Sequence, residues 1–266
     1  MKDQNAIGNV KRREITQLFT EGKRIDKREL TEYRPIVIEQ GVIERAEGSA
    51  RAKLGNTDVI VGVKIELGEP FPDTPNKGVL TVNAELTPMA SSSFEPGPPD
   101  EQSIELARVV DRVIRESGMI DLEKLCLIPR KTVFVIFIDI YAINYDGNLI
   151  DASAIAAVAA LINTKLFNYE VKDEEVTIKP GYSCLPINNY PVPVTIAKVG
   201  DKLVVDPSRE EEEVMDARVT IAIEKNQKIC AVQKGGIGYF TAKEISEAIE
   251  IAKSKSEEIR KILVKE

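Results

Sequence analysis

The sequence predicts an α+β fold in two halves, each of which runs strands, helix, strands and helix. Two observations indicate this fold class. Apolar residues alternate at period two over much of 34–86, and segments with helical spacing follow predicted strands in both halves. The chain has 266 residues, which is enough for one large domain or two small ones with a sizeable core.

The first half is expected to consist of an N-terminal helix and arm over residues 1–32 and a subdomain over 33–168. Gly22 follows the last apolar residues of the helix predicted over 10–21, and glycine commonly ends helices. Gly55 and Asn56 are typical of a two-residue hairpin turn. The other predicted strands and helices of this half cover 34–39, 42–45, 49–54, 57–67, 79–86, 100–117, 132–143 and 149–166.

Two of these elements have distinctive compositions. The strand over 132–143 is almost entirely β-branched or aromatic, which predicts that it is covered on both faces. The helix over 149–166 is rich in alanine and apolar nearly all round, which predicts a buried helix that lies close to a sheet.

The second half is predicted to be joined to the first by a linker over 169–190. This segment is acidic and then rich in Gly, Pro and Asn. A C-terminal subdomain over 191–266 follows, with hairpins over 192–205 and 217–233. Two capping-box patterns predict where a short helix and the long terminal helix begin: Ser208 with Glu211, and Thr241 with Glu244.

Three arginines share the polar face of the helix that follows the proline-rich segment 94–99. Arg108, Arg112 and Arg115 are four and three residues apart, which places them on one side of the helix. They could form a solvated face neutralised by nearby acidic residues at ion-pair spacing. They could also form a stripe that holds phosphates. Spacing alone leaves both interpretations open.

Charge and composition exclude several classes of function. The chain has 36 Lys and Arg and 43 Asp and Glu, a net charge of −7, so RNA binding would need a local basic patch. It has no histidine, which excludes Ser-His-Asp and Cys-His sites and any His-ligated metal. Its three scattered cysteines lack metal-site spacing. We find no signal peptide or long apolar run, which predicts a cytoplasmic protein without membrane association.

Several short segments together resemble the ribonuclease PH family: residues 47–50, 54–57, 104–106 and 204–206. More narrowly, three segments are similar to one branch of that family, the non-catalytic ring subunits of archaeal exosomes: residues 71–76, 94–101 and 105–112. The resemblance covers nearly the whole chain. It implies a ribonuclease PH-like fold of two βα subdomains with mixed sheets and packed helices.

The resemblance implies an inactive homologue that pairs with a catalytic ribonuclease PH-like subunit. Three such pairs would close a hexameric ring, which would degrade single-stranded RNA from its 3′ end with inorganic phosphate as nucleophile. In reverse, the ring would add 3′ tails. RNA-binding cap proteins are further expected partners. Phosphate, and any divalent metal, would bind in the partner subunit, so this chain is expected to hold no cofactor, catalytic residue or metal.

The resemblance also implies that a phosphate site has been lost. Where catalytic relatives have a Gly-Ser-Arg turn, this chain has Asp146, Gly147 and Asn148, so the guanidinium is missing and a carboxylate is added. Two like charges 4 Å apart repel by about 1 kcal/mol in water and about 4 kcal/mol at an effective dielectric constant of 20. Asp206 and Glu212 match the family's catalytic acids. We expect both to be structural here, because acids without cations cannot bind phosphate.

By the same resemblance, RNA contacts are expected on the helix. Glu101 and Gln102 stand where catalytic relatives carry an arginine pair that grips RNA. Arg108 and Arg112 match residues that face the partner's active site and hold the RNA backbone, and Arg115 lies one turn further on. Contacts to the backbone alone predict binding that is independent of sequence and sensitive to salt.

Two alternatives stay open. The chain could itself be an active phosphorolytic 3′–5′ exoribonuclease that uses Asp206 and Glu212. It could also be a non-enzymatic assembly protein without RNA contact. The turn at 146–148 opposes the first alternative, and the acidic net charge slightly favours the second.

Overall fold

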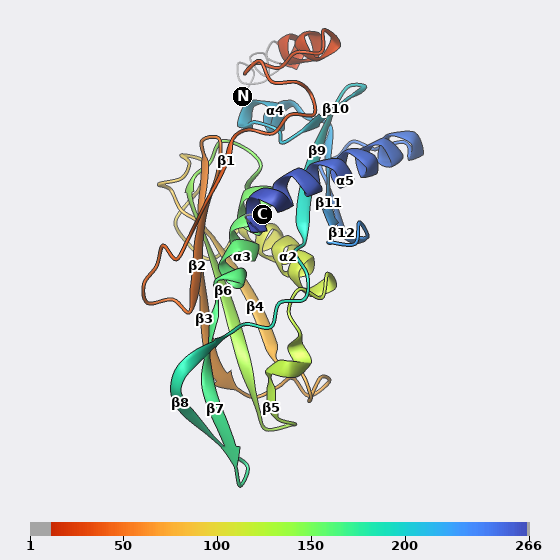
Figure 1. The fold of residues 1–266 in the computed structure, drawn as a ribbon. Helices are drawn as coiled ribbons and strands as arrows, with labels where there is room; N and C mark the ends of the chain where they lie inside the picture. Colours follow the sequence, from red (N-terminus) through yellow and green to blue (C-terminus); the bar gives the residue numbers. More distant parts are fainter. Residues whose placement is uncertain (1–11, 265–266) are drawn as a thin grey trace.

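The computed structural model describes residues 12–264 and shows two main sheets with helices packed on and between them (Figure 1). The predicted α+β class is confirmed. The strands are β1 (Ile36–Gln40), β2 (Gly48–Leu54), β3 (Thr57–Gly68), β4 (Val79–Leu86), β5 (Cys126–Ile128), β6 (Thr132–Asn144), β7 (Lys165–Lys172), β8 (Glu175–Cys184), β9 (Val192–Val199), β10 (Lys202–Val205), β11 (Ala217–Ile223) and β12 (Ile229–Gly235). The helices are α2 (Glu101–Glu116), the short η1 (Leu122–Leu125), α3 (Leu149–Ile162), α4 (Arg209–Val214) and α5 (Ala242–Val264).

The helix predicted over 10–21 is present from Arg12 to Thr20, and its predicted first residues lie outside the described part of the chain. Of the described helices, none has the length and apolar character needed to cross a bilayer.

The larger sheet has the strand order β1-β2-β3-β6-β4, with β5 paired to the start of β6. Its pairs are antiparallel except for β4 and β6, which run parallel, so the sheet is mixed. The smaller sheet has the order β10-β9-β11-β12 and is antiparallel throughout. Helix α2 packs on β4, and α5 packs on β9 and β11. Both α2 and β4 therefore lie at the same edge of the larger sheet.

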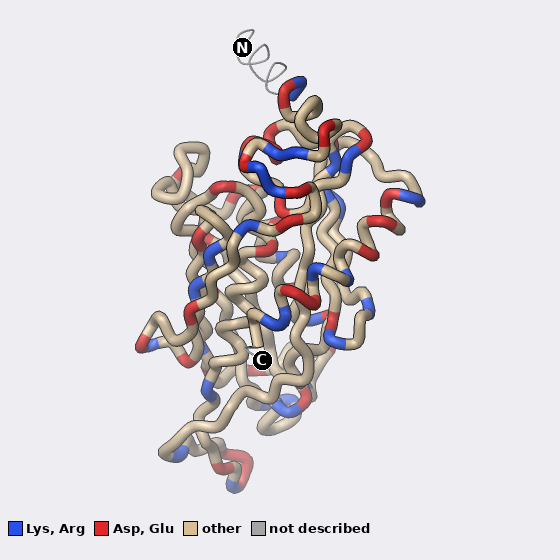
Figure 2. Tube along the Cα trace, turned by 45° about the horizontal axis from the view of Figure 1, so that its top comes forward, with Lys and Arg blue, Asp and Glu red and all other residues tan. Residues whose placement is uncertain are grey.

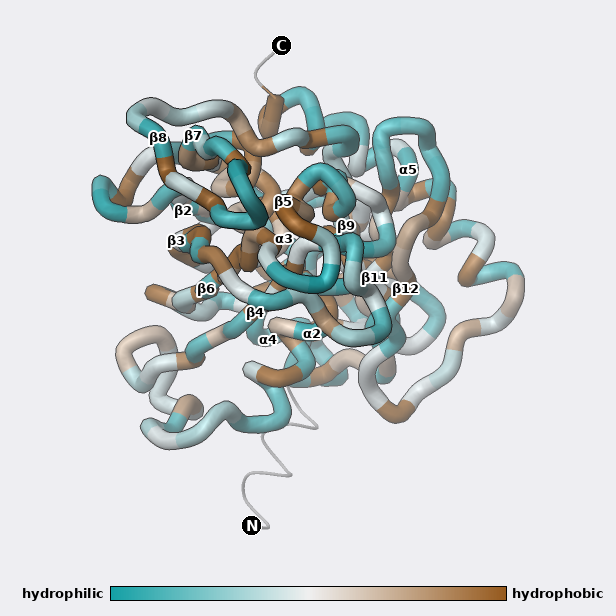
Figure 3. Tube along the Cα trace, turned by 90° about the horizontal axis from the view of Figure 1, so that it is seen from below, coloured by the Kyte–Doolittle hydropathy of each residue, from teal (hydrophilic) through white to brown (hydrophobic). Residues whose placement is uncertain are grey.

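Helix α3 lies between the two sheets and contacts β2, β3 and β9. Every residue from Ile150 to Leu161 is buried, which confirms the prediction of a buried helix. Hydrophobic segments gather around α3 at the centre of the molecule, while many of the outer loops are hydrophilic (Figure 3). Its alanines allow close packing: a β-carbon on Gly48 of β2 would lie 2.6 Å from the carbonyl oxygen of Ala160.

The segment 169–190, predicted as a linker, is not irregular: most of it belongs to a β-hairpin of β7 and β8 that projects from the sheets (Figure 1). Helix α3 ends at Ile162 rather than at residue 166. Asn163 caps the helix, with its backbone N–H directed to the carbonyl oxygens of Ala159 and Ala160 at 3.3 and 3.2 Å. Polar and apolar residues then alternate from Lys165 onward, as expected for a strand. The acidic and Gly/Pro/Asn-rich composition of the following residues hid this strand from the sequence analysis.

Two further predictions about strands are wrong. Residues 42–45 do not form a strand; they belong to the irregular connection between β1 and β2. Strand β6 is not covered on both faces. One face is buried in the core, whereas the other is partly open and its Tyr141 is 40% exposed. The aromatic and β-branched composition of β6 reflects strand propensity as well as burial.

Candidate functional site

The turn Asp146–Asn148 connects β6 to α3, as predicted. Gly147 has a φ of +89°, and a β-carbon there would lie 2.5 Å from main-chain atoms of Pro207, Ser208 and Arg209. The segment that carries the two predicted acids therefore packs directly against this turn. Only glycine allows so close an approach of two backbones.

Asp206 is fully buried beside this turn and accepts hydrogen bonds on both carboxylate oxygens. Its Oδ1 accepts from Nη2 of Arg34 at 2.7 Å and from Nδ2 of Asn148 at 2.9 Å. Its Oδ2 accepts from Nη1 of Arg28 and from the backbone N and Nε of Arg34, all at 2.9 Å. The carboxylate is thus an internal counter-ion with no oxygen left for a substrate or metal.

Glu212 holds the same turn from the other side and is partly buried. Its Oε1 accepts from the backbone N of Asn148 at 2.9 Å, and its Oε2 accepts from the hydroxyl of Tyr145 at 2.5 Å. Loss of hydration on burial raises the pKa of Glu212. The structure therefore brings Asp146–Asn148, Asp206 and Glu212 together, and the two acids are bonded to residues that shape the turn.

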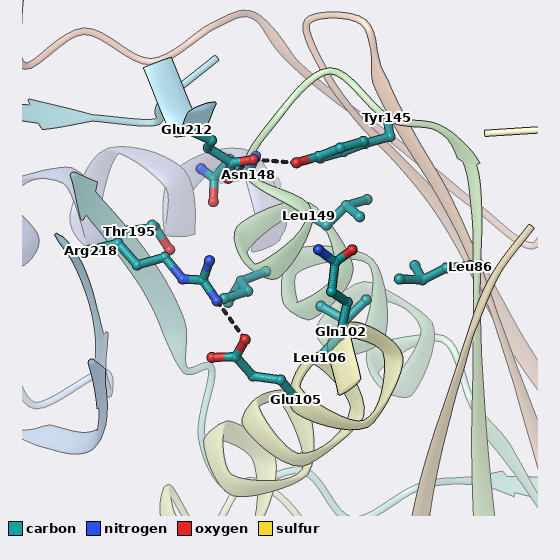
Figure 4. Close-up of a pocket in the computed structure, with 11 residues that line it drawn as sticks. Leu86, Gln102, Glu105, Leu106, Tyr145, Asn148, Leu149, Thr195, Glu212 and Arg218 are labelled. Atoms are coloured by element: carbon teal, nitrogen blue, oxygen red, sulfur yellow. Dashed lines mark hydrogen bonds and ion pairs between the residues drawn. The ribbon is translucent and has the colours of Figure 1, made fainter. Parts of the chain in front are cut away.

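A pocket of about 110 Å³ opens next to Glu212 (Figure 4). Its one cationic side chain is Arg218, which donates from Nη2 to Oε2 of Glu105 at 2.7 Å, while its Nε is buried without a partner among the described residues. With Glu105 and Glu212 the lining has two acids against one paired arginine. The pocket therefore offers no free positive charge to an anion. Its remaining lining residues are Leu86, Gln102, Leu106, Tyr145, Asn148, Leu149, Ile150 and Thr195.

The buried arginines between residues 24 and 34 were not predicted from the sequence. Arg24 is fully buried, pairs with Glu211 and donates to the carbonyl oxygen of Val205 at 2.8 Å. Arg34 donates to the carbonyl oxygens of Asp146 at 2.6 Å and Gly147 at 3.2 Å. These guanidinium groups point inward, toward the turn and its acids. The acids with which they pair, Glu211 and Asp206, lie more than 100 residues away, so no local pattern could have revealed the pairing.

Asp151, in the first turn of α3, extends this buried polar cluster. It accepts from the backbone N and Oγ1 of Thr195 at 2.9 and 2.8 Å, from the hydroxyl of Tyr33 at 2.7 Å and from Nδ2 of Asn148 at 2.8 Å. Burial raises its pKa from 3.8 to about 6, although the four donors oppose that rise.

This shift predicts a stability that depends on pH. Because the folded pKa of Asp151 lies above its ordinary value, its contribution is present below about pH 4 and is lost as pH rises through about 6. Relative to Asp151→Asn, we expect the free energy of unfolding of the unchanged chain to fall by roughly 2 kcal/mol between pH 4 and pH 7. Urea denaturation of both proteins at about pH 4 and pH 7 measures it. A difference that does not vary with pH would contradict the assignment.

The three arginines of α2 lie on the face of the helix that points away from the core. In Figure 2, Lys and Arg are interspersed with Asp and Glu along the trace, so a basic surface has to be local. Arg108 and Arg112 are exposed, and no carboxylate within residues 12–264 pairs with either. They line a groove of about 420 Å³ between α2 and the edge strand β4. The other groove residues are Leu80, Thr81, Val82, Ala107, Asp111 and Glu116.

Arg115 differs from its two neighbours. Its Nη2 donates to Oδ1 of Asp111 at 2.6 Å and to the carbonyl oxygen of Leu80 at 3.0 Å, and its Nε donates to Oδ2 of Asp111 at 3.1 Å. Of the three predicted phosphate-binding arginines, the structure therefore leaves two open and one engaged. In the described part of the chain, no group of three or more Cys, Asp and Glu could hold a metal ion.

Two family models match the chain: domain 1 of the 3′ exoribonuclease family over residues 32–166, and domain 2 of the same family over residues 189–255. The chain belongs to the 3′ exoribonuclease family. Within this family it is 54% identical to a protein of Pyrococcus horikoshii named "Exosome complex component Rrp42", over 99% of this chain and 97% of that protein. A protein of the same name from Methanothermobacter thermautotrophicus is 53% identical, over 94% and 92% of the two chains.

Solved structures of the 3′ exoribonuclease family show the same fold. A chain in a structure described as the Archaeoglobus fulgidus exosome with RNA bound to the active site has a TM-score of 0.88 and 45% identity, covering 96% of this chain and 98% of that one. A chain of an archaeal exosome core has a TM-score of 0.86 and 42% identity, covering 98% and 99%. The predicted resemblance and the predicted ribonuclease PH-like fold are confirmed.

Proposed function

We propose that this chain is a non-catalytic subunit of a hexameric exosome ring in the cytoplasm. It pairs with a catalytic ribonuclease PH-like subunit, and the ring also binds RNA-binding cap proteins. The assembled ring degrades single-stranded RNA from its 3′ end by phosphorolysis and adds 3′ tails in reverse. The names of its relatives support an exosome role, and one solved relative is described as having RNA bound to the active site.

The contrast between two surfaces of the chain carries this proposal. Phosphorolysis needs cationic donors that hold two phosphates together. Near the turn at 146–148, the guanidinium groups of Arg28 and Arg34 are bonded to Asp206, and Arg218 is bonded to Glu105. The groove between α2 and β4, in contrast, has two arginines, Arg108 and Arg112, with which no carboxylate of the described chain pairs. The chain is therefore suited to hold an RNA backbone and unsuited to bind a phosphate nucleophile. Phosphate, and any divalent metal, would belong to the partner subunit.

A reconstitution assay tests the proposal. The purified chain alone, mixed with inorganic phosphate and 5′-labelled single-stranded RNA, is expected to release no nucleoside diphosphates. The catalytic subunit with this chain is expected to degrade RNA faster than the catalytic subunit alone, because the chain adds RNA-holding contacts.

Each alternative predicts a different outcome of this assay. Release of nucleoside diphosphates by the chain alone would show that it is itself a phosphorolytic enzyme. If degradation by the catalytic subunit does not change when the chain is added, the chain is an assembly protein without RNA contact. A matched control is the same mixture without phosphate, in which neither protein should shorten the RNA.

A further inference from the structure

The groove between α2 and β4 contains two acids, Asp111 and Glu116, as well as two arginines that have no carboxylate partner within residues 12–264. Asp111 lines it together with Arg108 and Arg112, and its side chain is 30% exposed. A free carboxylate at this place would repel an RNA phosphate. It would also compete for a cation, since it stands three residues after Arg108, a spacing at which helical side chains pair.

The carboxylate of Asp111 is paired with Arg115. It bonds one oxygen of Asp111 from Nη2 at 2.6 Å and the other from Nε at 3.1 Å, in the two-pronged geometry that fixes both groups. The bond from Nη2 to the carbonyl oxygen of Leu80 at 3.0 Å anchors the guanidinium to strand β4. The hydrogen bond with Asp111 raises the pKa of Arg115, so the cation stays charged.

We infer that Arg115 is a positioning residue of the groove: it neutralises Asp111 and keeps that carboxylate from pairing with Arg108. Arg108 and Arg112 then remain free for phosphates. The inference rests on the proposed RNA binding by this groove, and it replaces the expectation that Arg115 itself contacts RNA. Its neighbours make the contact, and Arg115 determines whether they are available.

A rescue experiment tests this role in the assembled ring. Arg115→Gln is expected to weaken the binding of fluorescently labelled single-stranded RNA by roughly tenfold, the loss expected when one charge-assisted contact is withdrawn. Adding Asp111→Asn to Arg115→Gln is expected to restore the affinity to within about twofold of the unchanged ring, because the carboxylate is gone. If Arg115 touches RNA directly, the double variant stays as weak as the single one.

Two features of the design separate this inference from structural damage and from failure of the proposed function. Both variants lack the bond to Leu80, so recovery in the double variant cannot come from repaired structure; sedimentation confirms that each ring is intact. Arg112→Gln in parallel reports on the groove itself. If it binds RNA as the unchanged ring does, the proposed function is wrong. If it binds weakly while the double variant shows no recovery, only the role of Arg115 is overturned.

Discussion

Replacement of Asp206 with alanine is expected to lower the free energy of unfolding by about 3–5 kcal/mol, the usual cost of removing one partner from a buried ion pair. The substitution leaves two guanidinium groups, those of Arg28 and Arg34, buried without their counter-ion. It also removes an acceptor from Asn148, which caps α3. Urea denaturation followed by circular dichroism measures the change, since the chain has no Trp for fluorescence.

Two further variants serve as controls for this measurement. Asp201→Ala removes an exposed carboxylate five residues away and is expected to change the stability by less than about 0.5 kcal/mol. Asp206→Asn keeps one oxygen acceptor, so its loss of unfolding free energy should lie between those of Asp201→Ala and Asp206→Ala. It still gives a measurement if Asp206→Ala does not fold. A loss below about 1 kcal/mol for Asp206→Ala would mean that the acid is not the centre of the buried cluster.

Neutralising both open arginines of α2 is expected to have the largest effect on RNA. A hydrogen bond to a charged group contributes about 1.5–3 kcal/mol, so Arg108→Gln with Arg112→Gln should weaken RNA binding by the assembled ring at least about 100-fold. Loss of two phosphate contacts should also make the slope of log affinity against log salt shallower by about 1.4. Fluorescence anisotropy at several salt concentrations measures both quantities.

A charge-matched control separates contact from general electrostatics. Arg13→Gln with Arg45→Gln removes two exposed arginines elsewhere on the chain, neither of which has an ion pair within residues 12–264. This variant has the same net charge as the α2 variant and should bind RNA within about twofold of the unchanged ring. Equal losses in the two variants would show that α2 acts through net charge rather than contact.

The elements with a strong period were predictable from the sequence. Helix α2 follows from the helical spacing of its apolar residues, and α3 follows from its apolar surface on all sides. The pairing of strands β2 and β3 follows from the Gly55-Asn56 turn between them. The hairpin of β7 and β8 was not, because its acidic turn and its Pro180-Gly181 dipeptide have the composition of a linker. Cross-strand pairs such as Tyr169 with Ile178 stabilise it, and those pairs are visible only once the register is known.

The candidate site was predictable in its location and only partly in its chemistry. Resemblance indicated residues 146–148, Asp206 and Glu212, and the structure brings these segments together. The cations that neutralise Asp206 and the neighbouring Glu211 come from residues 24–34, where nothing in the local sequence distinguishes a buried arginine from an exposed one. Likewise, helical spacing placed Arg115 with Arg108 and Arg112 and also four residues after Asp111, so the sequence left both roles open. The structure shows that its guanidinium is engaged by Asp111 and by the carbonyl oxygen of Leu80.

The position of α3 between the two sheets has a consequence for how the molecule comes apart. A single hydrophobic cluster includes residues of α3 and the larger sheet together with Val192, Ile259 and Leu263 from the C-terminal half. Arg24 and Arg34 of the first half join the same halves through buried ion pairs with Glu211 and Asp206. Separation of the two halves would expose buried hydrophobic residues of both. We therefore expect the chain to unfold in one cooperative thermal transition. The two domains by which the family is described are accordingly expected to unfold together and not as independent units.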